Sequence, residues 1–324
     1  MTARAVWTLC TYADVHAALR DGRLAPHGVN ARGDETHRVV RAAVQQELPP
    51  ALLARWRGSL GARAEQRLSR LRDGDRVDLM RDVAQPWAHE VAQQVLGIPP
   101  QVVAACLPLS LTIFEESALA RTGAPSAALS QSATQLAVLL EGYGGAGTVQ
   151  SFVALTHTVP ALAAGAMLAL LQHPAQLAWL RVHDGEQTLS VVTNELLRFA
   201  GPSRAVFRTA LAPMSLGGKA IETDDEVVLL LSEANRDPTA FTDPDRLDVQ
   251  RAEFGHLAFG AGAHRCVGAG IVRILLHEAI AAFVRSAREF ELDASDGGVA
   301  WLHGFALRAP RAIPTIVRER RATL

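Results

Sequence analysis

The residues best suited to chemistry form a glycine-rich run that ends just past a cysteine. The run FGAGAHRCVG occupies residues 259–268 and leads into a predicted helix. A cysteine at the start of a helix lies near the positive end of the helix dipole, which favours the metal-binding thiolate. Gly260 and Gly268 allow backbone N–H groups and a flat cofactor to approach the sulfur, and Phe259 can shield it from water. The run therefore predicts a cofactor ligand at Cys266.

Two simpler interpretations of this run remain open. A glycine-rich turn that opens a helix can hold a phosphate group, although the glycine spacing differs from that of dinucleotide-binding loops. A lone cysteine is also commonly an inert buried thiol. The three cysteines, Cys10, Cys106 and Cys266, form no CxxC pair, so the sequence predicts neither a disulfide framework nor a structural zinc site.

Helices dominate the elements that must position the cysteine. Apolar residues recur at three- and four-residue spacing, and the expected helices are 12–20, 37–46, 52–72, 78–96, 148–172, 187–199 and 268–283. Short strands are expected over 207–216 and 226–231, followed by irregular backbone around Pro238 and Pro244. Because no repeat or low-complexity linker interrupts the chain, we predict a single domain over residues 1–324, mainly α with a small β part.

Composition excludes several classes of protein. Hydrophobic residues make up 49% and charged residues 20% of the chain, and the net charge is -1. This balance is typical of a globular protein and offers no general positive field for nucleic acid. The N-terminus lacks the pattern of a signal peptide, and the longest apolar run, 159–171, is too short to span a bilayer. We therefore expect a cytoplasmic protein without a membrane segment.

The run at 259–268 resembles the haem-binding loop of the cytochrome P450 family, because it matches FGxGxHxCxG at every fixed position. The resemblance implies a P450 fold that holds haem b, with the Cys266 thiolate as axial ligand. Glu195 and Arg198 match the ExxR helix of the family. With a second arginine, expected at Arg246, they are implied to form a buried structural charge network.

Four residues match the positions that contact the haem propionates in this family. His37 and Arg41 lie one helical turn apart, as in the HxxxR helix of the family, and Arg208 and His264 occupy the other two positions. Charge-assisted hydrogen bonds to carboxylates suit all four side chains. An exposed helix face is the alternative for His37 and Arg41.

The helix expected to cross the oxygen-binding face departs from the family pattern. Thr158 keeps the hydroxyl that the resemblance implies would hydrogen-bond dioxygen. Leu155 stands where a glycine normally leaves room beside the iron, and His157 replaces the acid that relays protons. Histidine can still pass protons near neutral pH, so His157 is a candidate relay. A His157 that is turned outward and bonded to a carbonyl is an equal alternative.

The chain is shorter than is usual for this family. The leading helix and strand before residue 7, and part of the lid between residues 100 and 148, are expected to be missing. We therefore expect an open pocket that suits a bulky substrate, or one delivered by a carrier protein or peptide. Its predicted lining residues are Phe152, Leu155, Thr158, Ser203, Arg204, Val206 and Phe305. An Arg204 that faces the haem would anchor a substrate carboxylate or phosphate, and one that faces solvent would not.

The resemblance implies an oxidase that hydroxylates, epoxidises or oxidatively couples a small organic molecule in specialised-metabolite biosynthesis. Electrons would come from a separate ferredoxin- or flavodoxin-type protein, because the sequence shows no flavin or iron–sulfur segment. The changes at Leu155 and His157 leave open a haem enzyme that uses peroxide or inserts no oxygen. A haem-binding or gas-sensing protein without turnover is the third alternative.

Overall fold

Helices form most of the molecule. The computed structural model describes residues 4–26, 35–47, 50–122, 124–145 and 147–320. The α-helices are α1 (Tyr12–Arg20), α2 (Glu35–Glu47), α3 (Pro50–Ser69), α4 (Gln85–Leu96), α5 (Pro100–Leu119), α6 (Ala127–Leu139), α7 (Thr148–Val153), α8 (Val159–Gln172), α9 (Pro174–Val182), α10 (Glu186–Ala200), α11 (Leu231–Ala234) and α12 (Ala269–Arg285). Shorter helical turns are the π-helical η1 (Leu79–Ala84) and η2 (Ala154–Thr158) and the 3₁₀ η3 (Gly262–His264) and η4 (Ala294–Asp296).

The strands of the described residues form four small sheets. They are β1 (Val6–Leu9), β2 (Leu24–Ala25), β3 (Arg76–Asp78), β4 (Ala205–Ala210), β5 (Met214–Leu216), β6 (Lys219–Ile221), β7 (Glu226–Leu230), β8 (Arg288–Leu292), β9 (Ala300–His303), β10 (Arg308–Ala312) and β11 (Pro314–Glu319). The strand orders are β1-β7-β4-β2, β3-β11-β8, β10-β9 and β5-β6. The predicted class, mainly α with a small β part, is confirmed.

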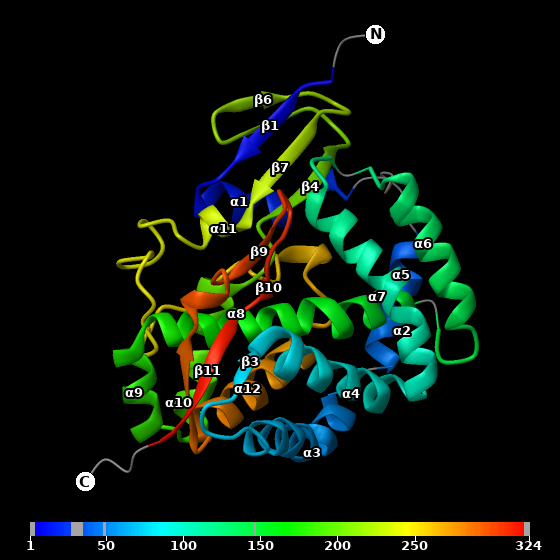
Figure 1. The fold of residues 1–324 in the computed structure, drawn as a ribbon. Helices are drawn as coiled ribbons and strands as arrows, with labels where there is room; N and C mark the ends of the chain where they lie inside the picture. The colour runs from blue at the N-terminus through cyan, green and yellow to red at the C-terminus, as the bar shows by residue number, and fades with distance from the viewer. Residues whose placement is uncertain (1–3, 27–34, 48–49, 123, 146, 321–324) are drawn as a thin grey trace.

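The continuous helix formed by α7, η2 and α8 crosses the centre of the molecule (Figure 1). In this view the four-stranded sheet lies above it, α3, α4 and α12 lie below it, and α5 and α6 flank one end. Almost every residue of α8 is buried, which explains why this helix is apolar on all sides. The central helix therefore lies between the four-stranded sheet and the group formed by α3, α4 and α12.

Several boundaries differ from the predicted ones. The strand expected over 207–216 is split into β4 and β5, because the backbone bends at 211–213. The helix expected over 78–96 begins with the π-helical turn η1, where the side chain of Asp78 accepts hydrogen bonds from backbone N–H groups. The segment at which the chain was expected to begin forms a strand that was not predicted, because β1 pairs in parallel with β7. Such a four-residue strand gives little local signal, since its partner lies over 200 residues away.

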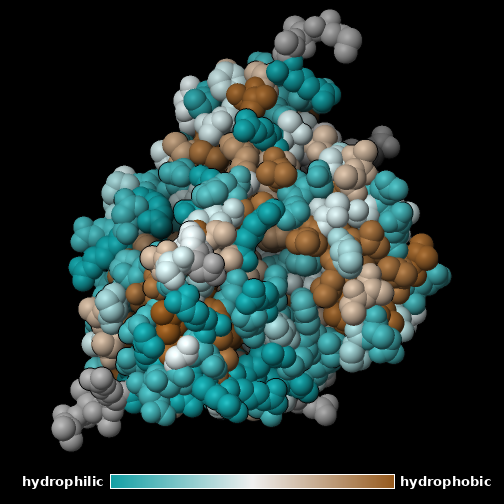
Figure 2. Space-filling view, viewed as in Figure 1, coloured by the Kyte–Doolittle hydropathy of each residue, from teal (hydrophilic) through white to brown (hydrophobic). Residues whose placement is uncertain are grey.

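By length and composition alone, two helical segments are long and apolar enough to cross a membrane. They are Pro100–Leu119 and Thr148–Gln172. The most apolar part of Thr148–Gln172 is 83% buried, as in a core helix. This helix is longer than the apolar run 159–171 that the sequence showed. The most apolar part of Pro100–Leu119 is 33% buried, and this helix packs on α6. Figure 2 shows apolar side chains gathered over α5 and α6, where the exposed residues are Leu111, Leu119, Val138 and Leu139. Length and composition alone are weak evidence for a membrane span.

Candidate functional site

The cysteine loop is fixed by its backbone and by the helix behind it. The N–H of Cys266 donates to the carbonyl oxygen of Phe259 at 2.8 Å. Gly260 and Gly262 have φ angles of +66° and +69°, which glycine adopts without strain. A Cβ at Gly262 would also overlap the carbonyl oxygen of Leu19, because α1 packs directly on the loop. Backbone conformation and packing thus both explain these glycines.

Cys266 is exposed as a residue. The protein packed around the sulfur nevertheless raises the pKa of the thiol, and this desolvation outweighs the hydrogen bond from the backbone of Gly268. The nearby positive charges that also lower the pKa belong to Arg41, Arg265 and Arg273. The backbone at the helix start therefore acts in the predicted direction, but burial has the larger effect on this pKa. Because a bound metal ion deprotonates a coordinating thiol, ligation itself would supply the thiolate.

Arg208, on β4, is a buried cation with no carboxylate partner among the residues that the structure describes. It is 7% exposed, and its Nη1 donates to the carbonyl oxygen of Phe207 at 2.8 Å. Burial lowers the pKa of Arg208 to about 10. An unpaired buried charge is costly, and a haem propionate would supply the missing partner. This unpaired charge is the feature of the structure that best fits haem.

Replacing Arg208 with glutamine should therefore weaken haem binding. Hydrogen bonds to charged groups contribute about 1.5–3 kcal/mol, so we expect haem to leave Arg208→Gln about 10- to 100-fold faster than the natural protein. Transfer of haem to an excess of acceptor protein measures this rate. The haem-free variant should at the same time gain thermal stability, because it no longer buries an unpaired charge. A variant that keeps its haem, or whose haem-free form is destabilised, would contradict the assignment.

The structure describes the other three predicted propionate contacts to different extents. Arg41, on α2, donates from Nη1 to the carbonyl oxygen of Arg265 at 2.8 Å, so this helix reaches the cysteine loop. His264 lies half-buried in η3, two residues before Cys266. His37 belongs to α2, but its side chain lies outside the described residues. The roles of all three toward haem stay predictions.

Glu195 and Arg198 form a buried ion pair on α10. Arg198 Nε lies 2.7 Å from Glu195 Oε2, and both side chains are 1% exposed. The second arginine is Arg251, whose Nε lies 3.1 Å from the same oxygen. The prediction of Arg246 is wrong, because its side chain is exposed and it joins the network through its carbonyl oxygen, 3.3 Å from Arg198 Nη2.

This charge network holds the irregular backbone that precedes the cysteine loop. Arg198 Nη1 donates to the carbonyl oxygens of Asn235 at 2.8 Å and Pro244 at 2.7 Å. Arg251 Nη1 donates to the carbonyl oxygen of Thr242 at 2.6 Å. Backbone without regular secondary structure needs other hydrogen-bond partners when it is buried, and guanidinium groups supply five donors each. The network is therefore structural.

The central helix contains a π-helical turn at the predicted oxygen-side residues. This turn, η2, covers Ala154–Thr158, and such turns are frequent at functional sites. Ala154 and Thr158 are half-buried, whereas Leu155 is 3% exposed and packs in the principal core. Neighbouring helical residues point in different directions, so Leu155 turns away from the face that Ala154 and Thr158 share. The expectations that Leu155 stands beside the iron and lines the pocket are therefore wrong.

His157 is buried and turned toward α5, so it does not face outward, but it does bond to a backbone carbonyl group, that of Leu107, as the alternative expected. Its Nε2 lies 2.8 Å from the hydroxyl oxygen of Ser110, and its ring stacks on Phe114 with ring centres 5.6 Å apart. Burial lowers the pKa of His157 to about 4, with a smaller contribution from the charge of His89. His157 is therefore neutral near pH 7. A neutral imidazole has one donor and one acceptor nitrogen, so it can exchange a proton with Ser110.

The pKa of His157 makes stability depend on pH. The unfolded chain takes up a proton near pH 6.5 and the folded chain only near pH 4, so stability is lost as pH falls through this range. Between pH 7 and 5 the loss attributable to His157 is about 2 kcal/mol. We expect His157→Gln to lose about 2 kcal/mol less than the natural protein over this range in urea unfolding. The exposed His183 provides a control, and a His157→Gln protein that loses as much as His183→Gln would contradict burial as the cause.

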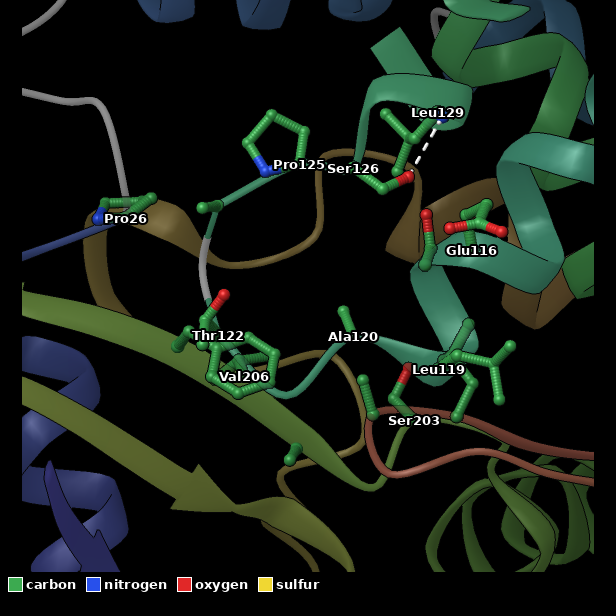
Figure 3. Close-up of a pocket in the computed structure, with 16 residues that line it drawn as sticks. Pro26, Glu116, Leu119, Ala120, Thr122, Pro125, Ser126, Leu129, Ser203 and Val206 are labelled. Atoms are coloured by element: carbon green, nitrogen blue, oxygen red, sulfur yellow. Dashed lines mark hydrogen bonds between the residues drawn. The ribbon is translucent and has the colours of Figure 1, made fainter.

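A pocket of about 610 Å³ lies between the α5–α6 connection and β4 (Figure 3). Ser203 and Val206, two of the predicted lining residues, face it. The opposite side is lined by Glu116, Leu119, Ala120, Thr122, Pro125 and Leu129. Leu119 is 54% exposed, so the pocket reaches the surface. Phe305 stacks on the lining residue Phe207 with ring centres 6.1 Å apart.

Two predicted pocket residues lie elsewhere. Phe152 is fully buried in a cluster with Val103 and Leu136, because its face of α7 is turned to α5 and α6. Arg204 lines a different cavity from Ser203 and Val206. Successive side chains of extended backbone point to opposite sides, so Arg204 faces away from the pocket that its immediate neighbours Ser203 and Ala205 line. The expectations for both residues in the substrate pocket are wrong.

The hairpin of β9 and β10 closes one side of the pocket against α5. The N–H of Ala306 donates to the carbonyl oxygen of Ala118 at 3.0 Å. A Cβ at Gly304 would overlap the same oxygen. The hairpin and the end of α5 are therefore in direct backbone contact.

Sequence reasoning missed Arg251 and Ser110. The sequence contained a signal for Arg251, because it continues the two-residue spacing of the apolar residues Leu247 and Val249. All three residues are buried in the structure. Ser110 gave no such signal, since its contact with His157 joins residues 47 positions apart.

Comparison with known proteins identifies one family. The cytochrome P450 family matches residues 187–300. Cytochrome P450 105C1 of Streptomyces sp is 31% identical over 327 residues, which cover 86% of this chain and 80% of that protein. Cytochrome P450 monooxygenase PikC of Streptomyces venezuelae is 31% identical over 276 residues, which cover 76% of this chain and 64% of PikC. The structure of P450BioI in complex with hexadec-9Z-enoic acid ligated acyl carrier protein has a TM-score of 0.82 at 21% identity, covering 96% of this chain and 91% of that one.

The chain belongs to the cytochrome P450 family, as the motif around Cys266 predicted. The P450 fold is confirmed by the likeness to P450BioI. The cofactor of the family is haem b with a cysteine thiolate ligand. The exposed residue Cys266 and the unpaired charge of Arg208 both fit this group.

Proposed function

We propose that this protein is a haem-thiolate oxidase that hydroxylates, epoxidises or oxidatively couples a small organic molecule in specialised-metabolite biosynthesis. The observation that carries the proposal is the cysteine loop, in which Cys266 is an exposed residue while the backbone is fixed by α1 and by the N–H of Cys266. Haem held by a thiolate supplies the oxidative chemistry, because the thiolate favours cleavage of an O–O bond.

The residues of the chain have distinct parts in this chemistry. Arg208 and Arg41 hold the propionates, and Cys266 binds the iron. Thr158 offers a hydroxyl on the half-buried face of η2, where no side-chain hydrogen bond with another described residue occupies it. His157 and Ser110, 2.8 Å apart, form a neutral pair that moves protons behind this face.

The substrate that we propose is a bulky organic molecule, free or attached to a carrier protein or peptide. The pocket of about 610 Å³ is in the range of small-molecule sites, and its walls are mostly apolar. Its opening beside Leu119 leaves space for a tether. P450BioI, which shares the fold, was solved with an acyl carrier protein, and this supports delivery by a carrier here. A ferredoxin- or flavodoxin-type donor would supply the electrons in the cytoplasm.

Turnover with two sources of oxidising equivalents tests the proposal. The purified holoenzyme is incubated with candidate free and carrier-bound substrates, and products are followed by mass spectrometry. One arm supplies dioxygen, a ferredoxin and its reductase, and the other supplies hydrogen peroxide. We expect product in the first arm, and less of it from Thr158→Val than from Thr158→Ser, which keeps the hydroxyl. Product with peroxide alone would favour the peroxide-driven alternative, and haem that binds gases without any product would contradict an oxidase.

A further inference from the structure

A second cavity, of about 650 Å³, lies apart from the pocket beside β4. Its walls come from the C-terminal half of α8, the end of α10, α11 and the β9–β10 hairpin. Three arginines line it, and we call it the arginine cavity. They are Arg204, Arg236 and Arg308.

Aromatic rings and a carbonyl oxygen orient these guanidinium groups. The guanidinium carbon of Arg308 lies 4.0 Å from the centre of the Trp301 ring, and that of Arg236 lies 4.6 Å from the centre of the Phe199 ring. Arg204 Nη1 donates to a carbonyl oxygen of the hairpin at 3.5 Å. Stacking on a ring fixes the plane of a guanidinium group without neutralising its charge. The N–H donors that are not already bonded to a carbonyl oxygen or to Asp245 therefore remain available to a ligand.

Positive charge exceeds negative charge around the cavity. Asp245 pairs with Arg236 at 2.8 Å, and Glu233 is the acidic residue that lines the cavity, on its exposed side. Arg204 and Arg308 have no ion-pair partner among the described residues. Burial lowers the pKa of Arg308, and repulsion from Arg204 and Arg236 lowers it further, so the three charges lie close enough to interact. An anion between them would relieve this repulsion.

We propose that the arginine cavity binds a small molecule that carries a phosphate group, at a site separate from Cys266 and from the pocket beside β4. Two guanidinium groups without carboxylate partners match the two charges and the paired oxygens of a phosphate monoester. The volume exceeds that of a phosphate ion, because small residues such as Gly165, Ala169 and Gly201 form part of the wall. The ring of Trp301 gives apolar surface for the organic part of the ligand.

Calorimetric titration of the haem-loaded enzyme tests this site, because bound haem keeps Arg208 from binding the probe. The three probes are inorganic phosphate, adenosine monophosphate and pantetheine 4′-phosphate. We expect one site, and we expect Arg204→Gln and Arg308→Gln each to weaken binding about 10- to 100-fold, as loss of a charged hydrogen bond does. Glu233→Gln should tighten binding about threefold, because it removes a negative charge from the rim.

Arg311→Gln is the matched control. Arg311 lies on the same strand as Arg308, is 55% exposed and pairs with Glu115 outside the cavity, so binding should not change. Circular dichroism and the haem spectrum show whether each variant is folded, and Arg204→Lys and Arg308→Lys replace any variant that is not. Tighter binding of one ester than of inorganic phosphate identifies an organic ligand, whereas equal binding identifies free phosphate.

Absence of binding at millimolar concentrations of all three probes would overturn the proposal. Equal binding by the natural protein and the arginine variants would overturn it as well. Failure of the enzyme to turn over any substrate would leave these binding results unchanged, so the two proposals fail separately.

Discussion

The Cys266→Ala protein will lack the thiolate-type absorption band of the reduced carbon monoxide complex. Cys266 is an exposed residue of the loop, and the backbone hydrogen bond from residue 266 to Phe259 does not need a side chain. The variant should therefore fold but lose thiolate ligation completely. Difference spectroscopy of the purified protein, with haem content from a pyridine assay, gives both quantities.

Cys10→Ala is the control for this experiment. Cys10 is also an exposed free cysteine, but it lies between β1 and α1 and not in the loop. Its spectrum should match that of the natural protein. A thiolate band that persists in Cys266→Ala would show that another residue binds the iron, and it would remove the basis of the proposed function.

Arg251→Ala should destabilise the protein by about 3–5 kcal/mol, the range observed when one partner of a buried ion pair is removed. The change leaves the 1% exposed carboxylate of Glu195 with one arginine where it had two, and it frees the carbonyl oxygen of Thr242. Arg246→Ala should change stability by no more than about 0.5 kcal/mol, because its side chain is exposed. Urea unfolding of the two variants measures the difference.

The comparison of these two arginines is also a test of the fold. The chain positions are five residues apart in the same irregular segment, so composition and local sequence hardly differ between the variants. A larger loss in Arg246→Ala than in Arg251→Ala would mean that the network is assigned to the wrong side chain.

Local patterns were enough to predict several helices and the cysteine loop, although α5, α6 and α9 were not among the expected helices. The helix over 12–20 matches α1, and the helix over 148–172 matches α7, η2 and α8, because apolar spacing and flanking breakers act within a few residues. The loop around Cys266 was recognisable because glycines stand at the positions where its backbone adopts positive φ angles.

Side-chain direction was harder to predict, because it depends on which neighbouring elements surround a residue. Leu155 was expected beside the iron and lies in the core, and Arg204 was expected in the substrate pocket and lies in the arginine cavity. In both cases the element was correct and the face was wrong. A rotation of one residue along a helix or strand changes the face, and single-sequence patterns do not resolve it where both sides are covered.

The contact between Gly304 and the carbonyl oxygen of Ala118 limits how the proposed substrate pocket can be reshaped. Any side chain at 304 would force the two backbones apart and break the hydrogen bond from Ala306. Substitutions meant to enlarge the pocket are therefore better placed at Thr122 and Pro125, on the opposite side of the pocket. A change of side-chain size there need not disturb the backbone contact between the hairpin and α5. One side of the pocket, formed by the β9–β10 hairpin and the end of α5, thus resists substitution, whereas the side formed by the α5–α6 connection tolerates it.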